Sequence, residues 1–170
     1  MKKSSVRNIQ RKIRILGIDP GLNITGYGVI AICGSGDPEV IEAGTFRMDP
    51  KASLGKRVTQ IYTDLSELIT EVTPDVVAVE QLYAHYKHPR TSILMGHARG
   101  VILLAAEQAG LTVHSIAATK VKKSLTGNGM ATKRQMQLAI QSVCKLAELP
   151  EPADVADALA IAMCAGRSIK

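Results

Sequence analysis

The spacing of apolar residues predicts β-strands in the first third of this chain. Three short apolar runs at 13–18, 25–32 and 40–46 are separated by the turn sequence Asp-Pro-Gly at 19–21 and by a Gly/Ser-rich cluster at 34–38. Runs of this length, rich in β-branched residues and bounded by Gly and Pro, are typical of strands. Because the connections are short, we expect an antiparallel meander.

A change of period to three and four residues predicts a long helix next. Apolar residues recur at this spacing from Leu54 to Val72, which is the stripe of an amphipathic helix, and Pro74 ends it. The run at 76–79 that follows is short and mostly β-branched, which is typical of a strand buried on both faces. This strand ends at Glu80, a residue that is seldom favoured in a buried strand.

The rest of the chain predicts four helices and one strand. The helices are expected at 91–109, 118–125, 132–146 and from Pro152 to about Gly166, and the strand at 111–116. The complete order βββαβαβααα predicts one α/β domain at 13–170, with a mixed five-stranded sheet flanked by helices. Residues 1–12 are polar and basic without periodicity, so we expect a disordered extension there.

Charge is distributed unevenly along the chain. The formal net charge is +6, and six Lys or Arg residues stand in the first fourteen positions without any acid. Residues 37–80 hold nine acids against four bases, whereas 87–134 holds eight bases and a single acid, Glu107. This pattern indicates a polyanion bound by cations beside an acidic centre. Aromatic residues make up only 3%, with no Trp, which argues against extensive stacking on single-stranded bases.

Several protein classes are disfavoured by composition. No apolar run approaches the ~20 residues that span a bilayer, and the basic start lacks the apolar core of a secretory signal, so we expect a cytoplasmic protein. The three cysteines form no CxxC pair, which argues against a disulfide framework or a zinc ribbon. The four histidines show no metal-binding spacing, and we interpret His85 and His88 as loop residues.

Four carboxylates stand at positions where the predicted fold could bring them together. Asp19 and Glu80 each end an apolar strand, and Asp154 and Asp157 are three residues apart at the start of the last helix, hence on one face. Individually the three aspartates have ordinary explanations, since Asp favours turns and helix N-termini, whereas Glu80 has none. Four converging carboxylates, however, need cations to stay ionised. Oxygen ligands select Mg²⁺ or Mn²⁺, and two such ions about 4 Å apart support phosphodiester hydrolysis.

Four segments carry a resemblance to a known family. They are ILGIDPGLNITGYGVI at 15–30, VVAVEQLYA at 76–84, MGHARGVILLAA at 95–106 and ADVADALAIA at 153–162. In this order and spacing they resemble the bacterial RuvC Holliday-junction resolvases over 15–167. The resemblance implies an RNase H-like fold and a structure-selective endonuclease. It would resolve four-way DNA junctions by paired symmetric nicks during recombination and repair.

The resemblance also implies roles for individual residues. The four carboxylates would bind two Mg²⁺ ions, with Mn²⁺ as a substitute, and form the catalytic set. Lys133 would act near the scissile phosphate and Lys122 would bind DNA, although in isolation both are ordinary exposed helix lysines. Tyr83 matches an aromatic position, usually Phe, that the family wedges into the junction centre. The cations of 87–134, Lys87 and Arg90 among them, are expected to hold the phosphate backbone.

The sequence also predicts binding partners and leaves alternative functions open. The helix at 91–109 resembles the family's homodimer interface and carries small residues suited to it, although the same face could equally pack on the sheet; these are Gly96, Ala98, Gly100, Ala105 and Ala106. The resemblance further implies a branch-migration partner of the RuvA/RuvB type. Three other hypotheses are a related nuclease acting on RNA, a nucleotide-binding module of the actin and sugar-kinase type, and a non-catalytic DNA-binding protein of this fold.

Overall fold

The predicted order of strands and helices is confirmed in the computed structural model, which describes residues 11–34, 36–82 and 89–169. None of the helices in these residues is both long and apolar enough to cross a membrane. The elements are β1 (Ile13–Asp19), β2 (Ile24–Ile32), β3 (Glu39–Arg47), α1 (Leu54–Val72), β4 (Val76–Glu80), α2 (Pro89–Gln108), β5 (Thr112–Ile116), α3 (Ala118–Thr126), α4 (Lys133–Val143) and α5 (Ala153–Ser168).

Helix α4 differs most from its predicted range of 132–146. It begins after Thr132, whose hydroxyl accepts from the Gln135 N–H while the Gln135 side chain accepts from the Thr132 N–H, a capping box. It ends at Val143 with Cys144 as its C-cap residue, and Lys145 then adopts a left-handed backbone with φ 53°. The apolar periodicity continues past this point, so hydrophobic spacing alone overestimates the length of the helix.

The sheet is mixed, with strand order β3-β2-β1-β4-β5. Strands β1, β2 and β3 form the expected antiparallel meander, while β4 runs parallel to both β1 and β5. Ile18 pairs with Val79 in the β1·β4 register, so Asp19 and Glu80, one residue further on, end neighbouring strands at the same edge of the sheet.

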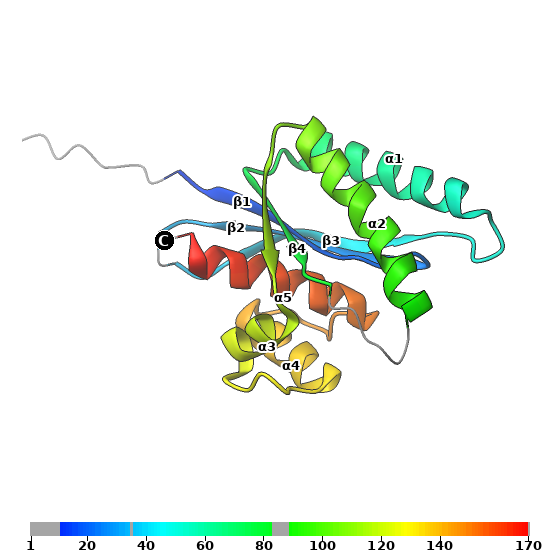
Figure 1. Cartoon of the computed structure of the whole chain (residues 1–170). Helices are drawn as coiled ribbons and strands as arrows, with labels where there is room; N and C mark the ends of the chain where they lie inside the picture. The colour runs from blue at the N-terminus through cyan, green and yellow to red at the C-terminus, as the bar shows by residue number, and fades with distance from the viewer. Residues whose placement is uncertain (1–10, 35, 83–88, 170) are drawn as a thin grey trace, which may run out of the picture.

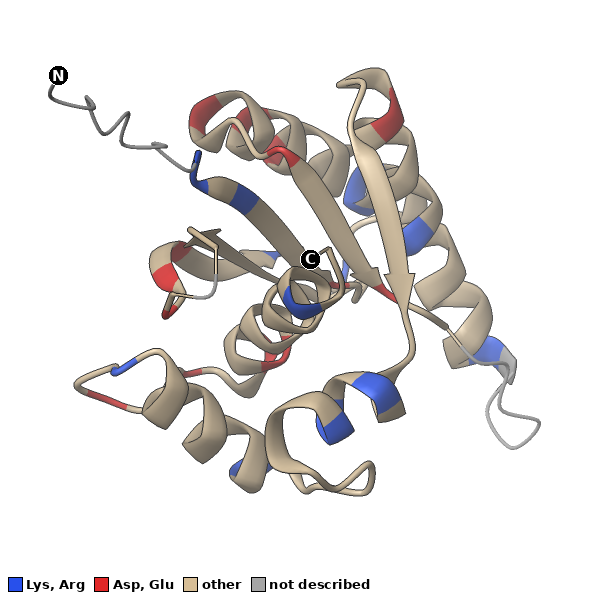
Figure 2. Cartoon of the chain, turned by 90° about the vertical axis from the view of Figure 1, so that its left-hand side faces the viewer, with Lys and Arg blue, Asp and Glu red and all other residues tan. Residues whose placement is uncertain are grey.

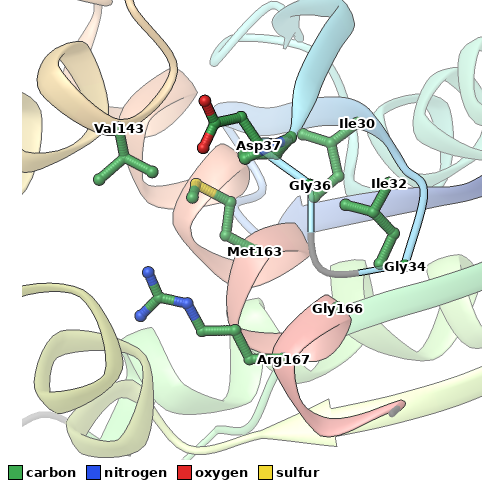
Figure 3. Close-up of a pocket in the computed structure, with 10 residues that line it drawn as sticks. Ile30, Ile32, Gly34, Gly36, Asp37, Val143, Met163, Gly166 and Arg167 are labelled. Atoms are coloured by element: carbon green, nitrogen blue, oxygen red, sulfur yellow. The ribbon is translucent and has the colours of Figure 1, made fainter.

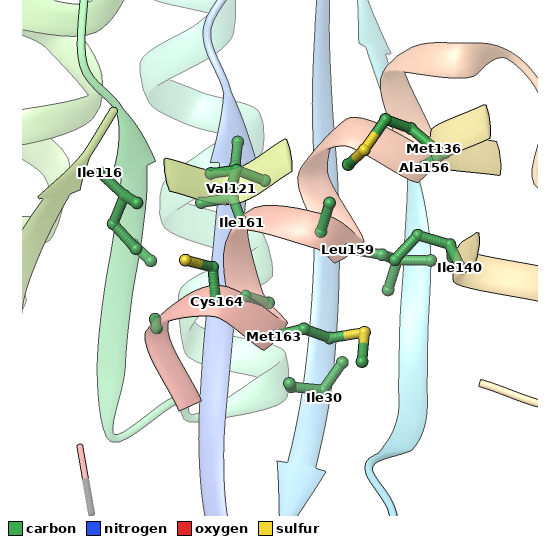
Figure 4. Close-up of a cluster of buried hydrophobic side chains, with 14 of the residues drawn as sticks. Ile30, Ile116, Val121, Met136, Ile140, Ala156, Leu159, Ile161, Met163 and Cys164 are labelled. Atoms are coloured by element: carbon green, nitrogen blue, oxygen red, sulfur yellow. The ribbon is translucent and has the colours of Figure 1, made fainter. Parts of the chain in front are cut away.

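Helices cover both faces of the sheet and divide the core into two clusters (Figure 1). Helices α1 and α2 pack on one face, against alternate residues such as Leu16 and Val77. Helix α5 packs on the opposite face, where Ile15 and Ala78 contact it, and α3 and α4 pack outside α5 (Figures 1 and 4). Strand side chains alternate between the two clusters with period two.

That alternation decides where the strand-end carboxylates point. Asp19 lies two residues beyond Gly17, which faces α5, and Glu80 lies two residues beyond Ala78, which belongs to the α5 cluster. Both carboxylates therefore project on the α5 side of the sheet rather than on the α1 and α2 side.

Glycines in β1 and β2 allow α5 to lie directly on the sheet backbone. A Cβ built on Gly17 would meet the Ala158 carbonyl oxygen at 2.2 Å. A Cβ on Gly26 would meet the Asp154 carbonyl oxygen at 2.2 Å. No other residue type fits such distances, so glycine is required for this close approach, which brings the first turn of α5 to the strand that pairs with β1.

Candidate active site

The carboxylates line one pocket at the carboxyl ends of β1 and β4. Its volume is about 380 Å³. Asp19 and Glu80 enter from the sheet, Asp154 and Asp157 from the first turns of α5, and two cations, Lys122 of α3 and Lys133 of α4, complete the polar lining. The structure thus brings together residues that are separated by up to 138 positions in the sequence.

The start of α5 is placed by local chemistry as well as by packing. Pro152 is its N-cap residue, and the Pro152 carbonyl accepts from the Val155 N–H at 3.0 Å. Asp19 pairs with Gly26 in the β1·β2 register, and Gly26 in turn lies against the backbone of Asp154. Gly26 of β2 therefore lies between β1, which bears Asp19, and the first turn of α5, which bears Asp154.

Burial and mutual repulsion raise the pKa of three of these carboxyl groups. Burial, followed by the charges of Glu80, Asp157 and Asp154, raises the pKa of Asp19 to about 8, and the Lys133 ammonium partly opposes this. Burial also raises the pKa of Glu80 and of Asp157. Lys122 and Lys133 act in the opposite direction on both groups. Ionised carboxylates here need compensating positive charge.

The donor set fits a hard divalent cation. All four acidic side chains offer oxygen ligands, which Mg²⁺ and Mn²⁺ prefer, and bound cations would relieve the repulsion that raises the pKa of Asp19. Within the ranges described, no three His, Cys, Asp or Glu side chains already stand close enough to form a coordination shell. The four carboxyl groups line the same pocket, and metal binding would require them to move closer together.

The raised pKa of Asp19 predicts an unusual pH dependence of stability for the metal-free protein. The folded state keeps a proton up to about pH 8, which the unfolded chain releases near pH 4, so stability is lost as pH rises through this window. We expect Asp19→Asn to exceed the native protein in melting temperature by roughly 5–10 °C at pH 8.5 in EDTA, and by much less at pH 4. Thermal unfolding across this pH range measures the difference, and parallel profiles for the two proteins would contradict it.

The other residues singled out from the sequence are placed as follows. Lys122 and Lys133 line the pocket, whereas Arg90 is exposed in the first turn of α2 and lies outside the pocket lining. Tyr83 and Lys87 fall outside the described residues. Figure 2 shows lysines on α3 and α4, on the same side of the sheet as the start of α5. Positive charge therefore stands beside the carboxylates.

Two arginines from the opposite face of the sheet contact the segments that carry Asp19 and Glu80. Arg57 of α1 hydrogen-bonds the loop that follows Asp19, and Arg99 of α2 hydrogen-bonds the end of the strand that carries Glu80. Arg99 lies in the segment at 95–106 that carries the family resemblance, but the sequence assigns no role to either arginine, because an arginine on a helix is ordinarily a solvated residue. Only the packing of α1 and α2 on the sheet reveals these contacts.

A second cavity lies at the opposite end of α5 (Figure 3). Its floor is apolar, formed by residues such as Ile30 and Met163, and Asp37 and Arg167 supply its charges. Arg167 hydrogen-bonds the Ser124 carbonyl, and the Asp37 carboxylate pairs with Lys145 at 2.6 Å, so both charges already have partners. This cavity offers no carboxylate cluster, unlike the pocket at the start of α5.

Comparison with known proteins places the chain beside one family. Residues 15–165 match the family model described as "Crossover junction endodeoxyribonuclease RuvC". The chain is 51% identical to the crossover junction endodeoxyribonuclease RuvC of Rhodopirellula baltica over 152 residues, which cover 88% of this chain and 84% of that relative. Among solved structures, it is similar to RuvC of Thermus thermophilus, with 32% identity, a TM-score of 0.81 and coverage of 89% and 92% of the two chains. A structure of T. thermophilus RuvC in complex with a Holliday junction substrate gives 31% identity, a TM-score of 0.86 and coverage of 92% and 94%.

Proposed function

Because this chain belongs to the family of RuvC crossover junction endodeoxyribonucleases, an RNase H-like family, we propose that it resolves four-way DNA junctions in the pocket that its four carboxylates line. The observation that carries this proposal is the convergence of Asp19, Glu80, Asp154 and Asp157 beside two lysines. The similarity to a RuvC that has been solved with a Holliday junction substrate supports the choice of substrate.

We infer that the carboxylates hold two Mg²⁺ ions, for which Mn²⁺ can substitute. Four acidic oxygen donors around one pocket support this inference, as does the raised pKa of Asp19. The chemistry that such ions supply when bound is activation of a water and stabilisation of the leaving oxygen. The four acidic residues of the pocket would hold and orient those ions.

The lysines have a separate task, which is to hold the phosphate backbone. Lys133 lies close enough to Asp19, Glu80 and Asp157 to lower the pKa of each, so its ammonium also lies close to a phosphate bound there. We assign it to the scissile phosphate and Lys122 to an adjacent one. Arg90 and Lys87 are proposed to contact the DNA arms, and Tyr83 to stack at the junction centre.

The exposed side of α2 supports a homodimer. Of the seven exposed large hydrophobic residues in the described part of the chain, three lie on this helix, with Ile93 62% and Leu104 50% exposed. Gly96 and Gly100 also have open space beside them, whereas Ala98, on the other side of the helix, is buried against the sheet. A small-residue surface with apolar neighbours suits self-association. Two-fold symmetry would present two pockets, as paired nicks require.

We expect Leu104→Glu to convert the dimer to a monomer. Placing a charge in an apolar, two-fold interface introduces it twice, and both copies lose hydration. Sedimentation velocity at micromolar concentration measures the change in mass. Leu138→Glu on α4 is the matched control, because Leu138 is exposed to a similar degree, 47%, on another helix. Equal masses for the native protein and the Leu104→Glu variant would show that this side of α2 does not form a dimer interface.

Cleavage of a synthetic mobile four-way junction tests the function. Linear duplex and an RNA/DNA hybrid are cut in parallel, each with Mg²⁺, Mn²⁺ or EDTA. We expect paired symmetric nicks in the junction alone, lost in EDTA. Cutting of the hybrid would favour an RNA nuclease, and tight junction binding without cutting would favour a non-catalytic protein. We further expect action on chromosomal DNA in the cytoplasm, together with a branch-migration complex of the RuvA/RuvB type.

A further inference from the structure

The loop that follows Asp19 and the end of the strand that carries Glu80 are each hydrogen-bonded by an arginine from the opposite face of the sheet. These arginines, Arg57 and Arg99, belong to α1 and α2, the helices on the face of the sheet opposite α5. The pocket itself receives its other polar residues from α3, α4 and α5. The arginines therefore approach the site from the layer that contributes no carboxylate to it.

Arg57 ties the loop after Asp19 to α1. Its Nε–H donates to the Leu22 carbonyl oxygen at 3.3 Å, and its Nη2 donates to the Asn23 side-chain oxygen. The Asn23 carbonyl also accepts from the Met48 N–H at 3.0 Å. The loop between β1 and β2 is thus hydrogen-bonded both by Arg57 of α1 and by the Met48 main chain.

Arg99 ties the end of β4 to α2 in the same manner. Its Nε–H donates to the carbonyl oxygen of Glu80 at 3.2 Å, and its Nη2 donates to the Ser115 hydroxyl at 2.6 Å. Ser115 lies on the neighbouring strand β5, where it pairs with Val79. The guanidinium therefore bridges two strands at the residue that bears the carboxylate.

The two contacts share one geometry, in which Nε binds a main-chain carbonyl and Nη2 binds a side-chain oxygen. A planar guanidinium holds both donors in a fixed relation, whereas a lysine ammonium is a single point with flexible reach. Lys122 and Lys133 are the cations that lower the pKa of Glu80, so the charge that acts on the carboxylates comes from inside the pocket. The arginines act on backbone position.

We propose that Arg57 and Arg99 are positioning residues that set the separation of the Asp19 and Glu80 carboxylates for metal binding. The proposal rests on the proposed metal-dependent function of this pocket. Partners that orient metal ligands without touching the metal typically contribute about 10- to 100-fold in affinity or activity. Arg57→Lys and Arg99→Lys keep the charge and lose the two-pronged geometry, which makes them the informative changes.

The first measurement is Mn²⁺ affinity of the DNA-free protein, by calorimetry and by the rise of melting temperature with Mn²⁺ concentration. We expect each lysine variant to bind Mn²⁺ about 10-fold more weakly, and to cut junctions at least 10-fold more slowly at subsaturating metal. Junction affinity in EDTA should stay within about twofold of native, because the DNA-binding lysines are untouched. Lys56→Gln, an exposed change on α1, is the control and should match the native protein.

A double-mutant cycle separates positioning from general damage to the fold. Ser115→Ala removes one acceptor of Arg99 without altering the arginine, and we expect it to reproduce part of the loss in Mn²⁺ affinity. Its effect should add little on top of Arg99→Lys, since both changes break the same contact. Native Mn²⁺ affinity in both arginine variants, or full additivity with Ser115→Ala, overturns the proposal. Normal cutting by Asp19→Asn would instead overturn the site itself.

Discussion

Asp19→Asn is expected to abolish junction cleavage while leaving junction binding intact. Asparagine keeps the shape of the side chain and loses the charge, so the carboxylate set can no longer hold its cations. Glu80→Gln should behave in the same way, because Glu80 lines the same pocket from the neighbouring strand. We expect the cleavage rate to fall at least 10³-fold in either variant, a loss of about 4 kcal/mol in transition-state stabilisation.

Asp19→Asn is expected to stabilise the metal-free fold although it abolishes cleavage. This contrast distinguishes loss of catalysis from loss of folding. Asp19 is partly buried beside other carboxylates, and its pKa is raised to about 8, so the native residue destabilises the metal-free fold at alkaline pH. An inactive variant that is more stable than the native protein in EDTA cannot have lost activity by unfolding. Gel-shift titration of a junction in EDTA provides the binding measurement. Normal cutting by either amide variant would show that the carboxylate assignment is wrong.

Gly26→Ala is the second change from which we expect a large effect. The added methyl would stand 2.2 Å from the Asp154 carbonyl oxygen, which is backbone and cannot rotate away. The first turn of α5 must therefore move from the sheet by about 1 Å, and a misplacement of that size can cost about 10²-fold in rate. Overpacking should also lower the free energy of unfolding by about 1–3 kcal/mol.

A second glycine provides the control for this change. Gly55 lies in the first turn of α1, and a Cβ there meets nothing within 4 Å. Gly55→Ala should leave cleavage unchanged and should stabilise the protein by about 0.5–1 kcal/mol, since alanine loses less backbone entropy in a helix. Chemical denaturation and single-turnover cleavage of both variants measure the contrast. Native cleavage by Gly26→Ala would show that the position of α5 tolerates such displacement.

The exposed and buried sides of α2 illustrate the limit of reasoning from residue types. The small residues of this helix suggested either a dimer interface or packing on the sheet. The structure divides them, because Ala98, Ala105 and Ala106 are buried against the sheet while Gly96 and Gly100 face open space. Periodicity could not separate the two sets, since apolar residues lie on both sides of the helix.

The sequence by itself determined the elements, their order and the acidic residues at their ends. Periods of two and of three to four residues are local properties, so they identify strands and helices without knowledge of the fold. The sequence also indicated that Asp154 and Asp157 share a helix face, because a separation of three residues is enough to fix that relation.

Only the tertiary structure decided that these residues meet. The parallel pairing of β1 with β4 and the projection of Asp19 and Glu80 toward α5 involve residues far apart in the chain. So do the hydrogen bonds of Arg57 to the loop after Asp19 and of Arg99 to the end of β4. Such contacts depend on which surfaces pack together. They are set by which helices pack on which face of the sheet, and no local pattern encodes that choice.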